Sequence, residues 1–202
     1  MATASAPGKV YLFGEHAVVY GEPAVPCAIR RRVRATVERR EDGLCVHAPD
    51  LALDGVTVGA DDHSVAVPDE RAETAVRYVT TAIDSARESA RAAGIDATTG
   101  FDVTVEGTIP PGAGLGSSAA LVVATLAAAA DELGVDLPRE RIADRAYRVE
   151  RAVQGEASRA DTFCSTMGGA VRVEGEDCRT LAAPALPLVV GYDGGGGDTG
   201  AL

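Results

Sequence analysis

The sequence predicts an α+β fold for this chain of 202 residues. Short apolar or alternating segments, typical of strands, occupy about the first forty residues before any helical periodicity begins. Strand-like and helical segments are mixed in the rest of the chain, whereas a doubly wound parallel sheet alternates strand and helix from the start. The length fits one domain, and a hydrophobic content of 46% is enough to build a core.

The predicted strands are short and are bounded by turn residues. In chain order they cover residues 10–13, 24–29, 33–37, 44–47, 101–106, 169–173 and 186–192, with a turn at 20–22. A polar stretch without a predicted element follows the fourth of these strands. We therefore expect the sheet to be built mainly from the N-terminal part of the chain.

Three segments have helical character. Residues 69–93 place their apolar side chains on one helical face and end at Gly94. Residues 117–133 form an apolar helix, and a third helix begins after Pro138 and runs to about residue 153. These helices follow the first group of strands, which is the order expected of an α+β fold.

Charge and cysteine content exclude several classes of function. The formal net charge of −11 argues against nucleic acid or an anionic membrane as a partner. No apolar run is long enough to cross a membrane and no secretory signal is found, so we expect a cytoplasmic protein. The cysteines lack paired metal-ligand spacing and are interpreted as buried apolar fillers or unreactive thiols: Cys27, Cys45, Cys164 and Cys178.

Lys9 is the only lysine in the chain, although acidic residues and arginines are abundant. This composition is typical of proteins adapted to high salt. An ammonium is a compact point charge and a guanidinium is a planar fork, so the retained lysine indicates a role that arginine cannot fill. Lys9 stands at the start of a predicted strand, and Glu15 and His16 follow six and seven positions later. A lysine near a reacting hydroxyl can lower the pKa of that hydroxyl and stabilise the charge that develops. The alternatives are an incidental lysine and a surface turn at Glu15 and His16.

A glycine-rich loop connects a predicted strand to the apolar helix that begins at Ser117. Gly112, Gly114 and Gly116 allow a sharp turn and a close approach to a ligand. Ser117 and Ser118 lie in the first helical turn, where free N–H groups and the helix dipole favour an anion such as a phosphate. The alternative is a glycine-rich hairpin before a capped core helix. The loop lacks the lysine of a P-loop and the acidic strand end of a dinucleotide-binding fold.

Two carboxylates are candidates for metal binding and proton transfer. Glu150 lies near the end of the third predicted helix, and Asp161 follows a short loop of small residues. One carboxylate on a helix and one on a loop could divide these two tasks between them. Acidic residues are common in this chain, so the pair alone is weak evidence.

Together these segments resemble the motifs of the GHMP kinase superfamily, whose members phosphorylate galactose, homoserine, mevalonate and phosphomevalonate. Residues 7–16 resemble its first motif, and residues 110–120 resemble its second, ATP-binding motif. The pattern P-G-K-x-x-L-x-G-E-H-A-V-V-x-G, followed by P-P-G-A-G-L-G-S-S-A-A, is most similar to the mevalonate kinases, here of an archaeal and halophile-like type. The segment E-x-x-x-x-G-x-x-S-x-x-D from Glu150 to Asp161 completes the match.

The resemblance implies a kinase of the mevalonate pathway in isoprenoid biosynthesis. Such an enzyme would transfer a phosphoryl group from ATP to the primary hydroxyl of mevalonate, with Mg²⁺ as cofactor. Ser118 and Glu150 would bind Mg²⁺. The residues that would hold the ATP phosphates are Pro111, Gly112, Ala113, Gly114, Leu115, Gly116, Ser117 and Ser118.

The resemblance also implies roles for the remaining motif residues. Asp161 would accept the proton of the substrate hydroxyl, and Lys9 would lower the pKa of that hydroxyl and pair with Asp161. Glu15 and His16 would contact mevalonate. Phosphoryl transfer requires mainly positioning and charge neutralisation, and these residue types supply both.

The implied fold is the GHMP kinase N-terminal domain, similar to domain 2 of ribosomal protein S5, with helices on one face of a mixed sheet. We expect residues 1–185 to form the ATP-binding and catalytic domain, and residues 186–202 to begin the connection to a C-terminal domain that this sequence lacks. The third motif of the family belongs to that domain, and the glycine run 194–197 has the wrong context for it. The resemblance also allows a homodimer.

One residue departs from the family pattern. Arg159 stands in the segment before Asp161 where the family commonly has glycine. This arginine could alter the geometry of Asp161 or contact the substrate. Two other functions stay open: another GHMP kinase acting on phosphomevalonate, homoserine or a sugar, or a nucleotide-binding fragment without catalysis.

Overall fold

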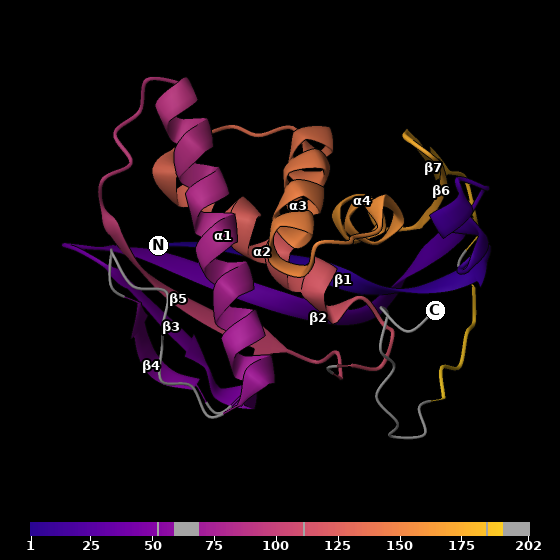
Figure 1. The fold of residues 1–202 in the computed structure, drawn as a ribbon, viewed down its shortest axis with the longest axis horizontal. Coiled ribbons are helices and arrows are strands. Elements are labelled where there is room, and N and C mark those ends of the chain that lie inside the picture. The colour runs from indigo at the N-terminus through magenta and orange to yellow at the C-terminus, as the bar shows by residue number, and fades with distance from the viewer. Residues whose placement is uncertain (52, 59–68, 111, 185, 192–202) are drawn as a thin grey trace.

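The computed structural model describes residues 1–51, 53–58, 69–110, 112–184 and 186–191. Within these ranges seven strands form one sheet in the order β4-β3-β5-β2-β6-β7, and β1 pairs with β2 (Figure 1). The strands are β1 (Ala2–Phe13), β2 (Val25–Arg40), β3 (Leu44–Ala48), β4 (Leu53–Val58), β5 (Gly100–Gly107), β6 (Ala170–Glu174) and β7 (Asp177–Leu181). The helices are α1 (Glu70–Ala92), α2 (Ser117–Leu133), α3 (Arg139–Gln154) and α4 (Arg159–Met167), with short 3-10 turns η1 (Ala17–Tyr20) and η2 (Pro49–Leu51).

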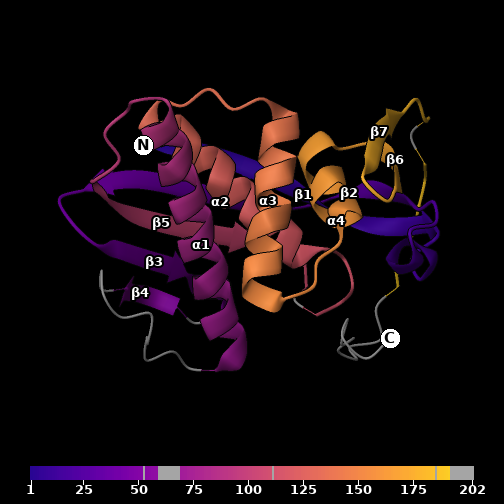
Figure 2. The ribbon, with the colours of Figure 1, turned by 45° about the horizontal axis from the view of Figure 1, so that its top comes forward.

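The sheet is mixed. β2 pairs antiparallel with β1, β5 and β6, whereas β3 pairs parallel with β5. The four helices lie on one face of the sheet (Figure 2). α2 and α4 pack against the strands, and α1 and α3 pack against α2 and against each other. The predicted α+β class, with a mixed sheet and helices on one face, is confirmed.

Helix α2 forms the centre of the core. It packs against β1 and β2 on one side and against α1 and α3 on the other. Most of its alanines are almost fully buried, and such small side chains allow the neighbouring elements to approach closely. Phe101 of β5, Ile83 of α1 and Leu126 of α2 are the largest of the fully buried side chains in this shared core. The sheet and the first turn of α2 are thus held in a fixed relative position.

Helix α1 has the amphipathic pattern that its sequence predicts. Its apolar face, which includes Val76, Val79 and Ile83, is buried in the core. The carboxylate of Asp69 caps the helix by accepting a hydrogen bond from the backbone N–H of Ala72 at 2.9 Å. Among the described helices, none combines the length and the apolar character needed to cross a bilayer.

Several predicted boundaries are wrong. The strands expected at 24–29 and 33–37 are one continuous strand, β2, because β1 pairs with it on both sides of the intervening arginines. Strands β4 and β7 were not predicted. Residues 186–191 were expected to be a strand but have no regular structure. A proline in this segment lacks the backbone N–H that a sheet hydrogen bond needs. The apolar run has no sheet partner among the described residues, and Val189 is 98% exposed.

The start of β1 lies against the glycine-rich loop. The backbone N–H of Lys9 donates to the carbonyl of Leu115 at 2.9 Å. A Cβ added at Gly8 would approach that carbonyl oxygen to 2.6 Å, and one added at Gly116 would approach Cγ of Lys9 to 2.9 Å. Neither position has space for a side chain, so the two segments are in direct contact.

We predict that Gly116→Ala destabilises the fold more than Gly134→Ala does. Both glycines have left-handed backbone conformations, with φ of 70° and 80°, so alanine is strained by about 1–2 kcal/mol at either position. Only at position 116 does the new methyl group also collide with Lys9, because a Cβ at position 134 meets no atom within 4 Å. Chemical denaturation of both variants measures the difference. Equal losses of unfolding free energy would show that the contact between the loop and Lys9 is loose.

Candidate active site

Lys9 connects three segments that are distant in sequence. Its side chain on β1 is buried, with 4% exposed. The ammonium Nζ lies 3.3 Å from Oδ2 of Asp161 on α4 and donates a hydrogen bond of 3.2 Å to the carbonyl of Gly114. The structure therefore brings the lone lysine, the glycine loop and Asp161 together.

Tyr11 completes this cluster and was missed in the sequence analysis. Its hydroxyl donates a hydrogen bond of 2.7 Å to Oδ1 of Asp161 and lies 3.1 Å from Oγ of Ser158. The ammonium of Lys9 is 4.4 Å from the centre of its ring. Burial and the neighbouring Asp161 raise the pKa of Tyr11, so its hydroxyl keeps its proton and remains a donor. The signal was available, because residues two apart on a strand share a face.

Asp161 lies in the first turn of α4 rather than on a loop, which corrects the expected placement. The sequence 159–167 is short and lacks a clear apolar period, so no helix was predicted there. A carboxylate is favoured in this first turn by the helix dipole. Lys9 and Tyr11 hold one oxygen each, and the side chain remains 23% exposed. Asp161 is fixed in orientation and still open to solvent.

Glu150, near the end of α3, is a buried carboxylate with 4% of its surface exposed. Burial, reinforced by the charge of Asp161, raises its pKa to about 7, while Ser118 and Lys9 oppose that rise. Two carboxylates with one ammonium leave this region short of positive charge. A divalent cation held by oxygen ligands would supply it, and the Ser118 hydroxyl and the Glu150 carboxylate fit as ligands for Mg²⁺.

The glycine loop presents open backbone on its outer side. Gly112 and Gly114 have φ of 71° and 68°, and a Cβ added at either position would meet no protein atom within 4 Å. The first backbone bond of α2 joins the N–H of Ala120 to the carbonyl of Gly116, so the N–H groups of the preceding turn point out of the helix end. Pro111 lies outside the described residues. The remaining residues of the predicted loop are Ala113, Leu115, Ser117 and Ser118.

Glu15 and His16 lie between β1 and η1 and are exposed. The charge of Glu15 is the smallest of the contributions that raise the pKa of Tyr11. The contacts found in the described part of the chain do not link His16 to Lys9 or Asp161. Neither residue of this pair has a hydrogen bond or ion pair with Lys9 or Asp161 in the described part of the chain.

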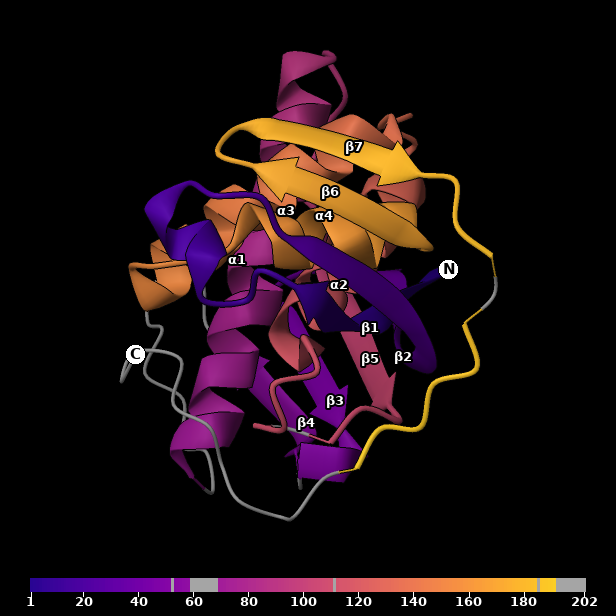
Figure 3. The same ribbon diagram turned by 90° about the vertical axis from the view of Figure 1, so that its right-hand side faces the viewer.

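Arg159 points away from Asp161. Its guanidinium stacks 4.2 Å from the ring centre of Tyr147 on α3 and lies 3.5 Å from Oδ1 of Asp144. A second nitrogen is 3.8 Å from the carboxylate of Glu176, in the turn between β6 and β7. Figure 3 shows the β6–β7 hairpin beside β2 with α4 behind it. Arg159 thus joins α4 to α3 and to this hairpin.

We predict that Glu150→Gln stabilises the metal-free protein as the pH rises. The pKa of Glu150 is raised from 4.5 to about 7 in the folded state. The contribution of its protonated form to the free energy of unfolding is therefore fully present below pH 4.5 and is lost as the pH rises through about 7. Glutamine avoids this loss. The variant should gain up to roughly 3 kcal/mol over the unmodified protein by about pH 8.

Thermal and chemical unfolding across this pH range measure the effect. Glu156→Gln, an exposed glutamate just beyond the same helix, is the control and should show no comparable pH dependence. A gain of Glu150→Gln that is equally large at pH 4 and pH 8 would contradict the assigned pKa shift.

We also predict an energetic coupling between Arg159 and Tyr147. Arginine stacked on an aromatic ring contributes about 0.5–1 kcal/mol when partly exposed, as it is here. A double-mutant cycle with Arg159→Gly and Tyr147→Leu, followed by urea unfolding, measures this coupling. Additive losses would show that the stacking contributes nothing to the attachment of α4.

The chain matches two family models. The GHMP kinases N terminal domain matches residues 77–169, and the galactokinase galactose-binding signature matches residues 2–39. The mevalonate kinase of Thermococcus gammatolerans is 40% identical over 199 residues, which are 97% of this chain and 58% of that protein. The mevalonate kinase of Pyrococcus furiosus is 39% identical over the same shares.

Solved structures agree with these matches. The mevalonate kinase of Methanococcus jannaschii superposes with a TM-score of 0.73 at 26% identity, over 90% of this chain and 56% of that one. The chain thus spans less than two thirds of the length of the relatives that it matches. The matched domain model, the sequence relatives and the shared fold lead to one conclusion: the chain belongs to the GHMP kinases and carries their N-terminal domain.

Proposed function

We propose that the protein containing this chain transfers the γ-phosphoryl group of ATP to the primary hydroxyl of mevalonate. The observation that carries the proposal is the contact of Lys9 with both Asp161 and the glycine loop, because it sets a candidate base beside a candidate phosphate site. The sequence similarity to mevalonate kinases over 97% of the chain supports the choice of substrate.

The glycine loop and the start of α2 would bind the phosphates of ATP. The open backbone at Gly112 and Gly114 and the outward N–H groups of the first helical turn suit an anion. Lys9 is hydrogen-bonded to the carbonyl of Gly114, so its charge would lie close to the transferred group. These groups would neutralise the charge that phosphoryl transfer concentrates on the γ-phosphate.

Asp161 would act as the general base. The hydroxyl oxygen of the substrate forms a bond to the γ-phosphorus, the bond from that phosphorus to the β,γ-bridging oxygen breaks, and ADP leaves with that electron pair. The proton of the hydroxyl passes to Asp161. Lys9 would lower the pKa of that hydroxyl, and Tyr11 would keep the carboxylate aimed by its 2.7 Å hydrogen bond.

Ser118 and Glu150 would hold Mg²⁺. Bound there with ATP, the ion would supply positive charge that screens the phosphate oxygens during transfer. The support from the structure is the buried carboxylate of Glu150, whose pKa is raised to about 7 partly by the charge of Asp161. A cation beside it would favour the ionised form.

Glu15 and His16 would contact the substrate from the segment after β1. We also propose that residues 1–185 are the ATP-binding and catalytic domain and that 186–202 lead to a C-terminal domain. This division is supported by the length of the relatives, because the chain spans 58% of the mevalonate kinase of Thermococcus gammatolerans. Turnover would then require the longer protein.

A sugar kinase is the second candidate. The match of residues 2–39 to a galactokinase galactose-binding signature favours it. A screen of the full-length protein with ATP, Mg²⁺ and a panel of mevalonate, phosphomevalonate, homoserine and galactose distinguishes the two by ADP release. We expect turnover with mevalonate. Turnover with galactose or homoserine and none with mevalonate would reject the proposed substrate.

We predict that Asp161→Asn removes turnover and preserves nucleotide binding. Loss of a general base commonly reduces kcat by about 100-fold or more, whereas the glycine loop is unchanged. Steady-state kinetics and nucleotide titration of the full-length protein measure the two effects. Asp136→Asn, an exposed aspartate between α2 and α3, is the matched control and should keep its activity. Undiminished kcat in Asp161→Asn would place the base elsewhere.

A further inference from the structure

The sheet carries a second group of chemically reactive side chains that the kinase proposal does not use. Cys45 and His47 alternate along β3 with residues of the main core, such as Val46. Asp102 alternates in the same way on β5, between the core residues Phe101 and Val103. Because successive strand residues point to opposite faces, the three side chains lie on the face of the sheet away from the helices.

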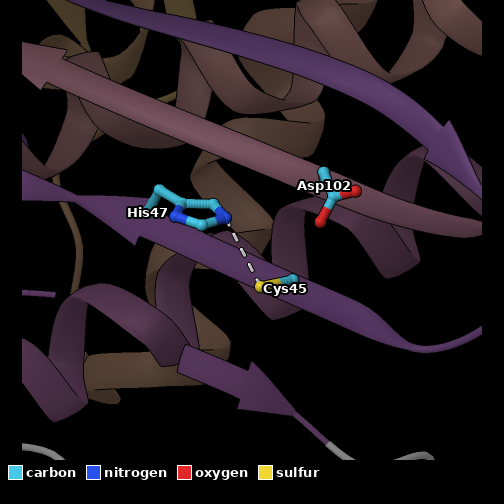
Figure 4. A group of neighbouring side chains, drawn as sticks. All are labelled: Cys45, His47 and Asp102. Atoms are coloured by element: carbon cyan, nitrogen blue, oxygen red, sulfur yellow. Dashed lines mark hydrogen bonds between the residues drawn. The ribbon is translucent and has the colours of Figure 1, made fainter. Parts of the chain in front are cut away.

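The parallel pairing of β3 and β5 brings these side chains together. Cys45 is opposite Asp102 in the register, and His47 is two residues further along the same face. Sγ of Cys45 lies 3.5 Å from Nε2 of His47, and the candidate ligand atoms of all three residues lie within 4.8 Å of one another (Figure 4). Cys45 is only 7% exposed, so its sulfur is held in place by its surroundings.

This geometry suits a tetrahedral metal ion. Zinc binds cysteine sulfur at about 2.3 Å and histidine nitrogen at about 2.0–2.1 Å, which places the two ligand atoms about 3.6 Å apart in a tetrahedron. The observed separation of Sγ and Nε2, 3.5 Å, already has this value. We propose that Cys45, His47 and Asp102 form a site for a divalent transition-metal ion of the zinc class, with water at the fourth position.

Arg40 is the competitor for this site. Its Nη1 lies 2.9 Å from Oδ1 of Asp102, and both side chains are substantially exposed. Ion pairs of this kind contribute only about 0–1 kcal/mol. A metal ion bound to the thiolate of Cys45 and the imidazole of His47 can therefore displace Arg40 from the carboxylate of Asp102. The Arg40 side chain then turns to solvent.

Metal binding here releases one proton. The thiol of Cys45 loses its proton to solvent as its sulfur forms the bond to the metal, and no electron is transferred. The ion would join β3 directly to β5, two strands far apart in the sequence. We therefore expect binding to stabilise the folded protein, in proportion to metal concentration.

Titration of the metal-free, full-length protein with Co²⁺ tests the proposal. We expect one equivalent to bind, with a thiolate-to-cobalt charge-transfer band and the strong visible absorption of a tetrahedral ion, and Zn²⁺ to displace it. Cys45→Ser and His47→Gln should abolish the band and weaken binding by at least about 100-fold, since even outer partners of metal ligands change affinity 10- to 100-fold. Cys178→Ser, a half-buried thiol on β7, is the matched control and should bind normally.

Arg40→Gln is the decisive second variant. It retains all three ligands and removes the competitor for Asp102, so we expect Co²⁺ to bind several-fold more tightly. Asp102→Asn should bind more weakly. A protein that folds, as judged by circular dichroism, and shows no thiolate band in either the unmodified form or Arg40→Gln would overturn the proposal. Retention of the band in Cys45→Ser would do so as well.

Discussion

The buried ammonium of Lys9 is the constraint on which the rest of the candidate active site depends. An unpaired charge with only 4% of its surface exposed would cost several kcal/mol, so its partners must all be present. Those partners are the carboxylate of Asp161, the carbonyl of Gly114 and the ring of Tyr11. They come from α4, the glycine loop and β1. Pairing the charge of Lys9 therefore fixes the relative positions of these three segments. The absence of a side chain at Gly116 leaves space for the Lys9 side chain.

The same cluster is electrostatically incomplete. Lys9 balances one carboxylate, yet Asp161 and Glu150 both act on the region, and the buried Glu150 responds with a pKa of about 7. A group with that pKa is partly protonated at neutral pH and is sensitive to any added positive charge. A divalent cation beside Asp161 and Glu150 would therefore favour the ionised form of both carboxylates. The proposed Mg²⁺ would supply this positive charge.

The sequence predicts local features well and non-local ones poorly. The apolar period of α1 and the glycine loop are visible because each depends on neighbouring residues, and Lys9 is visible because it is the only lysine in the chain. Helix α4 was missed because nine residues with mixed polarity have no clear period. Tyr11 required only the two-residue period of a strand. The cluster of Cys45 and Asp102 could not be predicted, since it depends on the parallel register of β3 with β5, which no local pattern specifies.

Arg159 shows how a departure from the family pattern can leave the site intact. A cation at the first residue of a helix is opposed by the helix dipole, which favours an anion there. The side chain avoids this conflict by reaching away to stack on Tyr147 and to approach Asp144 of α3. The carboxylate of Asp161 is then the charged group that remains at the N-terminus of α4, held by Lys9 and Tyr11. The arginine therefore attaches α4 to its neighbours without competing for the carboxylate of Asp161, the proposed base.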